Sequence, residues 1–323
     1  MSSGLHRHSR LRPVLSQWAT RNSDSSQISP ATPRLWETRS GGYDARVTKF
    51  AACFLLVFGE LAFGGMCALA VPPFFRIERG FYKSSAGVYT TSGFITMLGL
   101  AALAARHTHP EEPSALALSI AAALWLSFSI AAGLYVVTLW TDTARLRARA
   151  FTAALAIGFT AVIAVMLAIE PASFGVAGAM MYALTAVTSS LMLGSVSAAM
   201  MFGHWYLIDP NLPVEYLRSL VRVLAWALCA DLAALFLALG ILAISGGPEH
   251  TAVAGLIDRH AALLAARILF GPGATLVLTW MTWQTLKVPQ TMAATGLLYI
   301  AVMAALVGEM LGRFILFRTA VPL

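Results

Sequence analysis

The sequence has few charged residues and few cysteines, and each shortage restricts the class of protein. Charged residues make up 11% of the 323 residues, whereas a soluble domain carries roughly 25%. Hydrophobic residues reach 58%, and the mean hydropathy is +0.73. The three cysteines show no CxxC spacing and fall within hydrophobic stretches. The composition therefore indicates a polytopic membrane protein that encodes neither a disulfide framework nor a cysteine-ligated iron–sulfur cluster.

Apolar runs of about 20 residues recur along the chain, each long enough to cross a hydrocarbon core of about 30 Å. Most prolines after the N-terminal segment fall between these runs, as residues that cannot continue a helix should. We expect an all-α, polytopic integral membrane helix bundle of about eight transmembrane helices, a domain over 47–323. The predicted spans are 48–71, 86–105, 114–140, 150–169, 174–203, 222–244, 261–283 and 292–317.

The first 46 residues have a different composition, rich in serine, arginine and proline. Such a segment cannot bury a core, so we expect a disordered basic tail over 1–46. It has no apolar stretch of the kind found in a cleaved secretory signal, and an over-extended start or a basic cytoplasmic tail explains it equally well. The formal charge of +7 comes largely from this tail and from short loops. We therefore expect no nucleic-acid partner.

The loop charges predict an orientation. An even number of spans places both chain ends on one side of the membrane, here named side A. Loops on the opposite side, side B, hold Arg76, Arg79, Lys83, Arg145, Arg147, Arg149, Arg218, Arg222 and Lys287, and loops on side A hold Arg106, Arg259 and Arg318. By the positive-inside rule side B is cytoplasmic and side A extracytoplasmic, although the basic N-terminal tail favours the reverse.

Five ionisable residues lie inside the predicted spans: Glu60, Asp231, Arg267, Glu309 and Arg313. Ionisable groups are costly in lipid and normally face one another or a cavity. Glu309 and Arg313 are spaced i, i+4 and can pair on one helix face. Helix rise places all five between mid-membrane and side A, so we expect them to converge there. Two interpretations stay open, structural ion pairs between helices or a polar pocket suited to a quinone headgroup.

Histidines offer little support for a bound haem. A haem b needs two axial histidines at similar depth, and the available pairing is His107 or His109 with His260, all at helix ends on side A. We expect no haem, with a haem b at that pair as the alternative, and no metal site. His204, in the segment GHWYLIDPNLP, is interpreted as a capping or interfacial residue.

Small residues mark other positions within the spans. The stretch Ser189–Ser195 and the segment Gly271-Pro272-Gly273 predict close helix packing and a kink. The second segment is also typical of the broken helices of transporters.

Short motifs in three spans resemble the membrane anchor subunit of the DMSO reductase family of molybdoenzymes, a relative of polysulfide-reductase-type quinone-interacting subunits. The strongest is GEMLGR, residues 308–313, followed by Phe317; Arg267-Ile268-Leu269 and Phe58-Gly59-Glu60 with Gly64-Gly65 are similar to further segments of that family. Glu60 replaces a glutamine of the family pattern. The N-terminal tail and the GHWYL motif are not features of the family.

The resemblance implies a function for the polar residues. It implies a haem-free anchor that passes electrons between exchangeable menaquinol or ubiquinol and an iron–sulfur subunit, with a molybdopterin-type catalytic subunit on side A, in anaerobic respiration at the bacterial inner (cytoplasmic) membrane. Glu309, Arg313, Arg267 and His107 would form the quinol site. Glu60 and Asp231 would transfer protons, and the chain itself would perform no substrate reduction. The alternatives are a proton-coupled secondary transporter and a structural or assembly subunit of a respiratory complex.

Overall fold

The computed structural model describes residues 35–105, 113–169, 174–206, 208–209, 211–288 and 290–323. The chain divides into two compact units, residues 1–48 and 49–323, and the arrangement given below is that of the second unit. The predicted tail over 1–46 lies outside the described residues up to residue 34. Helix α2 begins at Leu35, before the predicted start of the first span.

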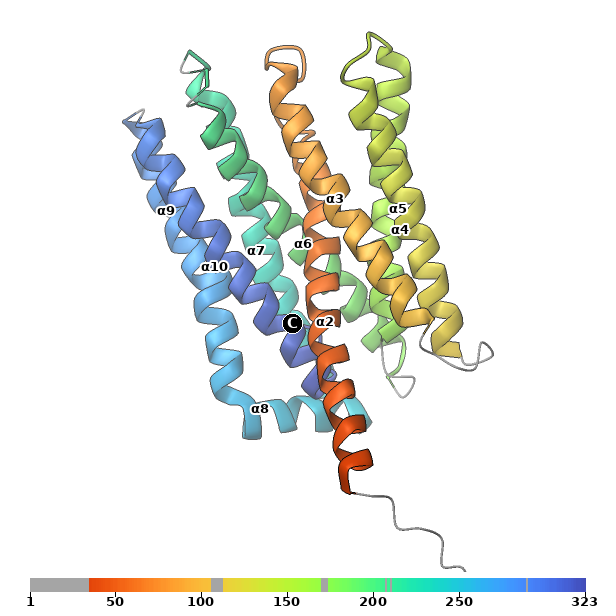
Figure 1. Cartoon of the computed structure of the whole chain (residues 1–323). Coiled ribbons are helices and arrows are strands. Elements are labelled where there is room, and N and C mark those ends of the chain that lie inside the picture. Colours follow the sequence, from red (N-terminus) through yellow and green to blue (C-terminus); the bar gives the residue numbers. More distant parts are fainter. Residues whose placement is uncertain (1–34, 106–112, 170–173, 207, 210, 289) are drawn as a thin grey trace, which may run out of the picture. The chain divides into compact units, whose positions relative to one another are not determined.

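The described residues form helices joined by short loops, with no strand among them (Figure 1). The helices are α2 (Leu35–Ala68), α3 (Arg79–Ala104), α4 (Pro113–Thr138), α5 (Ala144–Ile169), α6 (Val176–Trp205), α7 (Val214–Ile244), α8 (Gly247–Ile268), the π-helical turn η1 (Leu269–Gly273), α9 (Ala274–Lys287) and α10 (Thr291–Thr319). Within the described part of the chain, eight helical spans are long and apolar enough to cross a membrane. The predicted all-α membrane bundle and its eight spans are confirmed.

Several helices begin earlier than the apolar runs suggest. Helix α7 starts at Val214, directly after Pro213, rather than at the expected residue 222. Its first two turns contain Glu215 and Arg218, which lower the local hydropathy. The apolar run therefore starts later than the helix does. Helices α3 and α5 also begin six or seven residues before their predicted starts, 86 and 150. Hydropathy marks the part of a helix that lies in lipid, whereas the helix itself continues into the interface.

The seventh span contains a bend that the sequence prediction lacked. Residues Gly247–Lys287 form a 41-residue span, which as a straight helix is about 60 Å long, twice the hydrocarbon thickness. His260 has non-helical dihedral angles, φ −131° and ψ 20°. The first part of α8 runs across the side A end of the bundle, and the second part turns to run beside α10 (Figure 1). The expected start at residue 261 is therefore where the membrane-crossing part begins.

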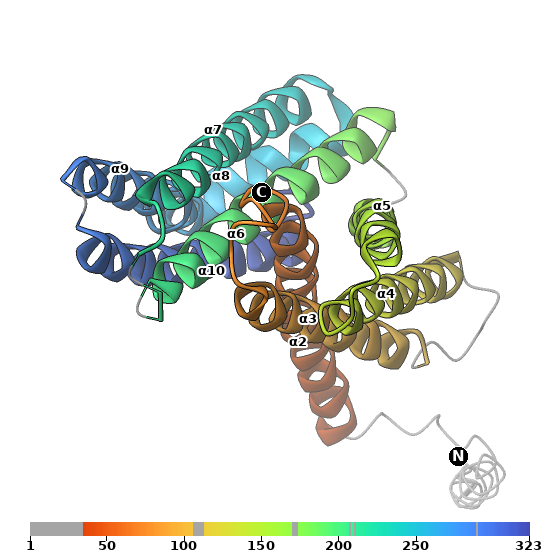
Figure 2. The same cartoon turned by 90° about the horizontal axis from the view of Figure 1, so that it is seen from above.

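Glycines allow the central helices to approach closely. A Cβ atom at Gly64 in α2 would lie 1.6 Å from the carbonyl oxygen of Ser190 in α6, and one at Gly194 would lie 1.9 Å from the carbonyl carbon of Gly64. A Cβ atom at Gly308 in α10 would lie 2.1 Å from the Cα atom of Gly271 in η1. The close packing predicted from these small-residue stretches is confirmed. Seen from above, α3, α4 and α5 lie on one side of α6, and α7, α8 and α9 lie on the other (Figure 2).

Candidate functional site

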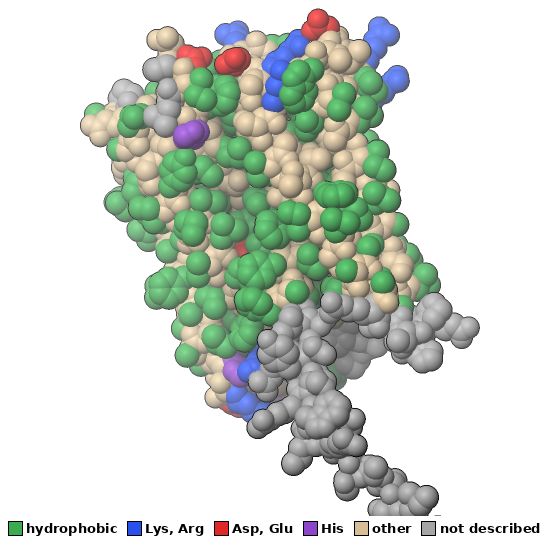
Figure 3. All heavy atoms as spheres, in the orientation of Figure 1, with side chains coloured by type: hydrophobic (Ala, Val, Ile, Leu, Met, Phe, Trp, Pro, Cys, Tyr) green, Lys and Arg blue, Asp and Glu red, His purple; other side chains and the backbone are tan. Residues whose placement is uncertain are grey.

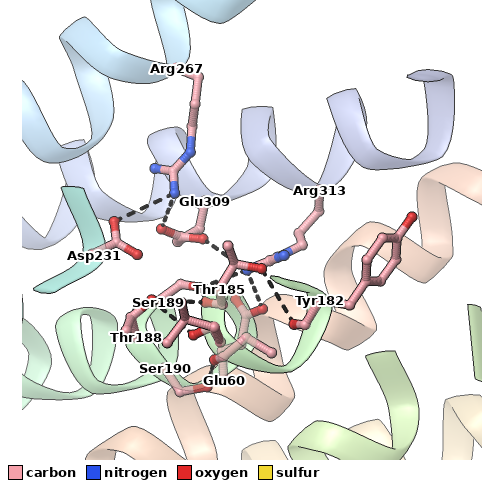
Figure 4. A network of polar contacts seen from close by, with 12 residues as sticks. Glu60, Tyr182, Thr185, Thr188, Ser189, Ser190, Asp231, Arg267, Glu309 and Arg313 are labelled. Atoms are coloured by element: carbon pink, nitrogen blue, oxygen red, sulfur yellow. Dashed lines mark hydrogen bonds and ion pairs between the residues drawn. The ribbon is translucent and has the colours of Figure 1, made fainter. Parts of the chain in front are cut away.

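Three of the five intramembrane charged residues meet where α7, α8 and α10 come together. The Arg267 Nη2 atom lies 2.7 Å from Oε1 of Glu309 and 3.7 Å from Oδ2 of Asp231. The side chains of Arg267 and Glu309 are completely buried, and 4% of the Asp231 side chain is exposed. Arg267 therefore joins a carboxylate on α7 to a carboxylate on α10 without contact with water (Figure 4).

The second arginine extends this contact to α2. The Arg313 Nη2 atom lies 2.7 Å from Oε1 of Glu60 and 3.4 Å from Oε2 of Glu309. Glu309 thus contacts both arginines, one through each carboxylate oxygen. The expected i, i+4 pair between Glu309 and Arg313 is present, and the shorter contact of Arg313 is with Glu60 on α2.

The five residues form one chain of alternating charge, from Asp231 through Arg267, Glu309 and Arg313 to Glu60 (Figure 4). We name this set the charge network. Each arginine has two carboxylate neighbours, so the cost of burying the charges is offset by contacts on both sides. The expected convergence between mid-membrane and side A is confirmed: Glu309 lies ten residues, about 15 Å, before Thr319 at the side A end of α10.

Helix α6 supplies a hydroxyl to the charge network. The Nη2 atom of Arg313 donates a hydrogen bond of 2.7 Å to Oγ of Ser189, and this hydroxyl donates to the carbonyl oxygen of Thr185. Ser189 was expected only to mark close packing of small residues. Its role as a partner of Arg313 was missed, because helical periodicity alone does not indicate which face of α6 meets α10.

Glycines leave room for the guanidinium group of Arg267. A Cβ atom would lie 2.5 Å from Nη1 if placed on Gly271, and 2.8 Å from Nε if placed on Gly312. At Gly308 the corresponding distance to Nη1 is 3.1 Å. Helix α10 and the η1 turn therefore form a cradle that any larger side chain would fill. The GEMLGR segment combines two of these glycines with the two charged residues of α10.

Several polar atoms of the charge network remain without a hydrogen-bond partner. Among the described residues, these buried atoms include Oε2 of Glu60 and the Nε and Nη1 atoms of both Arg267 and Arg313. A buried polar atom without a partner costs roughly 1–3 kcal/mol. Glu60 can therefore accept a further hydrogen bond from a small polar group, and Arg313 can donate further hydrogen bonds to one.

An apolar groove between α2 and α10 lies next to the charge network. It has a volume of about 510 Å³, and its lining includes Val57 and Leu61 of α2 with Met310 and Phe314 of α10. Glu60 directly precedes Leu61, and Arg313 lies between Met310 and Phe314 in α10. Figure 3 shows a small patch of acidic side-chain atoms among the hydrophobic side chains of one face of the bundle. The groove is apolar enough for a lipid-soluble molecule, and its lining includes sequence neighbours of Glu60 and Arg313 rather than the network residues themselves.

A second, much smaller cavity lies on the other side of Glu60. Its volume is about 10 Å³, and its lining includes Thr96 and Trp125. This volume is about the minimum for one water molecule. The Nε1 atom of Trp125 is buried and has no hydrogen-bond partner among the described residues. Glu60 thus lies between a small, mostly apolar cavity and the arginine that it pairs with.

The histidines are distributed differently from the charged residues. His107 and His109 lie outside the described residues, so neither the expected quinol contact of His107 nor a histidine pair with His260 is located. His260 lies at the bend of α8. The Nδ1 atom of His204, in the last turn of α6, lies 2.9 Å from the hydroxyl of Tyr299 in α10. Tyr299 was not predicted from the sequence as the partner of His204.

No protein family matches the chain, and no curated protein matches it.

Proposed function

We propose that this chain is the quinol-binding membrane subunit of a multi-subunit oxidoreductase, the function implied by its resemblance to the DMSO reductase anchor subunits. The observation that supports the proposal best is the juxtaposition of the charge network with the groove between α2 and α10. A quinol has an apolar isoprenoid chain and two polar oxygens. The apolar groove suits the chain, and the buried polar atoms beside the groove suit the oxygens.

Each residue of the charge network has a separate role in the proposed oxidation of quinol. Oxidation of a quinol to a quinone releases two electrons and two protons. In the proposed site, the unpaired N–H groups of Arg313 hydrogen-bond a quinol oxygen, and the Oε2 atom of Glu60 accepts a proton from the hydroxyl. Glu309 holds the two arginines at a fixed spacing. Asp231, at the far end of the charge network, is the proposed acceptor of the second proton, while Arg267 keeps its own proton and balances the charge of Asp231.

The electrons require an acceptor outside this chain. The sequence lacks the CxxC spacing of a cysteine-ligated cluster, so the proposal assigns the acceptor to an iron–sulfur subunit that docks on side A, with a molybdopterin-type subunit beyond it. The first part of α8 runs across that end of the bundle and presents a surface for docking (Figure 1). The proposed location is the bacterial inner membrane with side A extracytoplasmic, and His107 on side A remains a proposed quinol ligand.

The experiment that tests the proposal blocks the groove and counts bound quinone. Met310→Trp places a large ring in the groove, and Met303→Trp places the same ring at a position of α10 that is 60% exposed and outside the groove. Quinone is extracted from each purified protein and quantified by chromatography. We expect bound quinone in the wild type and in Met303→Trp, and its loss in Met310→Trp. Equal amounts of bound quinone in the two variants, or no bound quinone in the wild type, would contradict the proposal.

A second variant separates proton transfer from a purely structural role of the network. Glu60→Gln keeps the shape of the side chain and introduces the amide of the resembled family. We expect this variant to fold and retain quinone, with quinol oxidation by membranes reduced about 10²-fold or more, the effect of losing a general base. Glu78→Gln, at an exposed position, is the control. Unchanged oxidation in Glu60→Gln, or a loss of folded protein, would indicate structural ion pairs.

A proton-coupled secondary transporter is the second candidate, favoured by the π-helical turn Leu269–Gly273 with Pro272 inside it. This turn interrupts the span directly after Arg267, as discontinuous helices do in transporters. A tagged pull-down in mild detergent separates the two candidates. An iron–sulfur protein that copurifies supports the anchor. A chain that purifies alone, and that carries protons together with a solute into proteoliposomes so that their interior becomes acidic, supports the transporter.

A further inference from the structure

A pocket at the side B end of the bundle contains a buried arginine far from the charge network. It has a volume of about 410 Å³ and lies between the end of α2 and the start of α5. Its walls are mostly apolar and include five aromatic rings, and its lining contains Phe74, Phe75, Tyr82, Tyr135, Arg147 and Phe151. The volume is within the range of sites that bind small molecules.

Arg147 is 8% exposed and is held in a fixed position. Its Nη1 atom donates to the carbonyl oxygens of Thr138 and Thr141, at 3.3 and 3.4 Å. Its guanidinium carbon lies 4.5 Å from the centre of the Phe74 ring. These contacts leave the positive charge without a carboxylate within ion-pair distance among the described residues. Asp142 is near enough to interact electrostatically with Arg147 but does not pair with it directly, so a buried charge is left that an anion can neutralise.

The surroundings of the pocket carry excess positive charge. The segments 69–83 and 139–149 contain six basic residues and two acidic residues. One acidic residue, Asp142, is already paired with Arg79 at 2.8 Å. An anionic ligand is therefore favoured over a neutral or zwitterionic one.

Interface markers place the pocket at the level of the lipid headgroups. Trp140 is exposed, and the Nζ atom of Lys83 lies 4.4 Å from the centre of its ring. Tryptophan is enriched at the membrane–water interface, and basic residues are enriched in the cytoplasmic loops beside it. Phe75 is 92% exposed at the rim of the pocket, where an acyl chain in the adjacent lipid layer can pack against it.

We propose that this pocket binds the headgroup of an anionic phospholipid. In this arrangement the phosphate pairs with the guanidinium group of Arg147, since arginine binds phosphate through parallel N–H donors. The headgroup occupies the aromatic pocket, and the acyl chains lie against Phe75 and Phe151 on the lipid side. Basic pockets between transmembrane helices recognise anionic lipids through the same chemistry.

The test is lipid binding to the full chain in detergent, measured by native mass spectrometry. The probes are phosphatidylglycerol and phosphatidylcholine with identical acyl chains. We expect the wild type to bind phosphatidylglycerol about fivefold more tightly, the effect of one basic residue at an anionic surface. Arg147→Gln should remove this preference. Arg149→Gln, two residues further along α5 and exposed, should keep it. No preference in the wild type, or a preference retained in Arg147→Gln, would overturn the proposal.

A second pair of variants keeps the test informative if Arg147→Gln fails to fold. Ala148 is exposed and lines the pocket, so Ala148→Trp fills the pocket while Arg147 stays in place. Leu146→Trp adds a ring to the same helix outside the pocket. We expect loss of the lipid preference in Ala148→Trp alone. Retention in Ala148→Trp, or displacement of phosphatidylglycerol by an equal concentration of inorganic phosphate, would refute a lipid site.

Discussion

Removal of Arg267 should destabilise the fold strongly, and removal of its partner Asp231 should reverse part of that loss. Arg267→Gln leaves three buried carboxylates, on Glu60, Asp231 and Glu309, facing one arginine. An uncompensated buried charge costs roughly 3–5 kcal/mol. Asp231→Asn should cost about 1 kcal/mol, because Arg267 keeps its 2.7 Å contact with Glu309. In the double variant, two carboxylates (Glu60 and Glu309) face one arginine (Arg313). The acidic groups therefore outnumber the basic groups by one, as in the wild type.

We therefore expect a coupling free energy of at least about 1 kcal/mol between these two positions. The assay is unfolding of the purified protein in mixed micelles with increasing sodium dodecyl sulfate, followed by tryptophan fluorescence. Arg259→Gln, at an exposed position in the first part of α8, is the control and should change little. If Arg267→Gln is neutral, or if the two single effects simply add, the charge network does not have the energetic coupling inferred here.

Two further predictions concern helix packing and the surface. Gly64→Ala should separate α2 from α6 and abolish the monodisperse peak in size-exclusion chromatography, since its Cβ atom would meet the Ser190 carbonyl. Gly240→Ala should behave as the wild type, because no atom of the described residues lies within 4 Å of the new Cβ atom. A normal Gly64→Ala profile would contradict the close crossing of α2 and α6. Arg79 beside Asp142 lowers the pKa of that carboxyl, so the pair should stabilise the protein above the unfolded pKa of about 4 and lose this effect as pH falls through the lower folded value. The melting temperature of Asp142→Asn should then be slightly lower than that of the wild type at pH 7 and equal to it near pH 2. A difference in melting temperature that grows as the pH falls would contradict this prediction.

The sequence predicted the class of fold because hydropathy depends on composition within one span. The depth of each ionisable residue in the membrane could be calculated from the rise per residue of its helix. For this reason the convergence of the five ionisable residues was expected. The partners were not predictable, because the contact between Arg313 and Glu60 depends on how α2 and α10 are rotated relative to each other. A single sequence carries no direct signal for that rotation.

Local backbone departures were also beyond the sequence pattern. The segment Gly271-Pro272-Gly273 indicated an irregularity, and the structure resolves it as a π-helical turn packed against Gly308. The bend at His260 had no such signal, since neither glycine nor proline stands there. The first part of α8 is too polar for a span, and its path across the end of the bundle depends on contacts with other helices.

The most direct measurement of the central claim is photolabelling of the membrane-embedded protein with an azidoquinone, followed by mass spectrometry of the labelled peptides. The account predicts label on residues 50–61 of α2 and 306–314 of α10, which line the groove, and competition by unlabelled quinone. Label confined to α7 and α9, or label that excess quinone does not reduce, would contradict a quinol site beside the charge network.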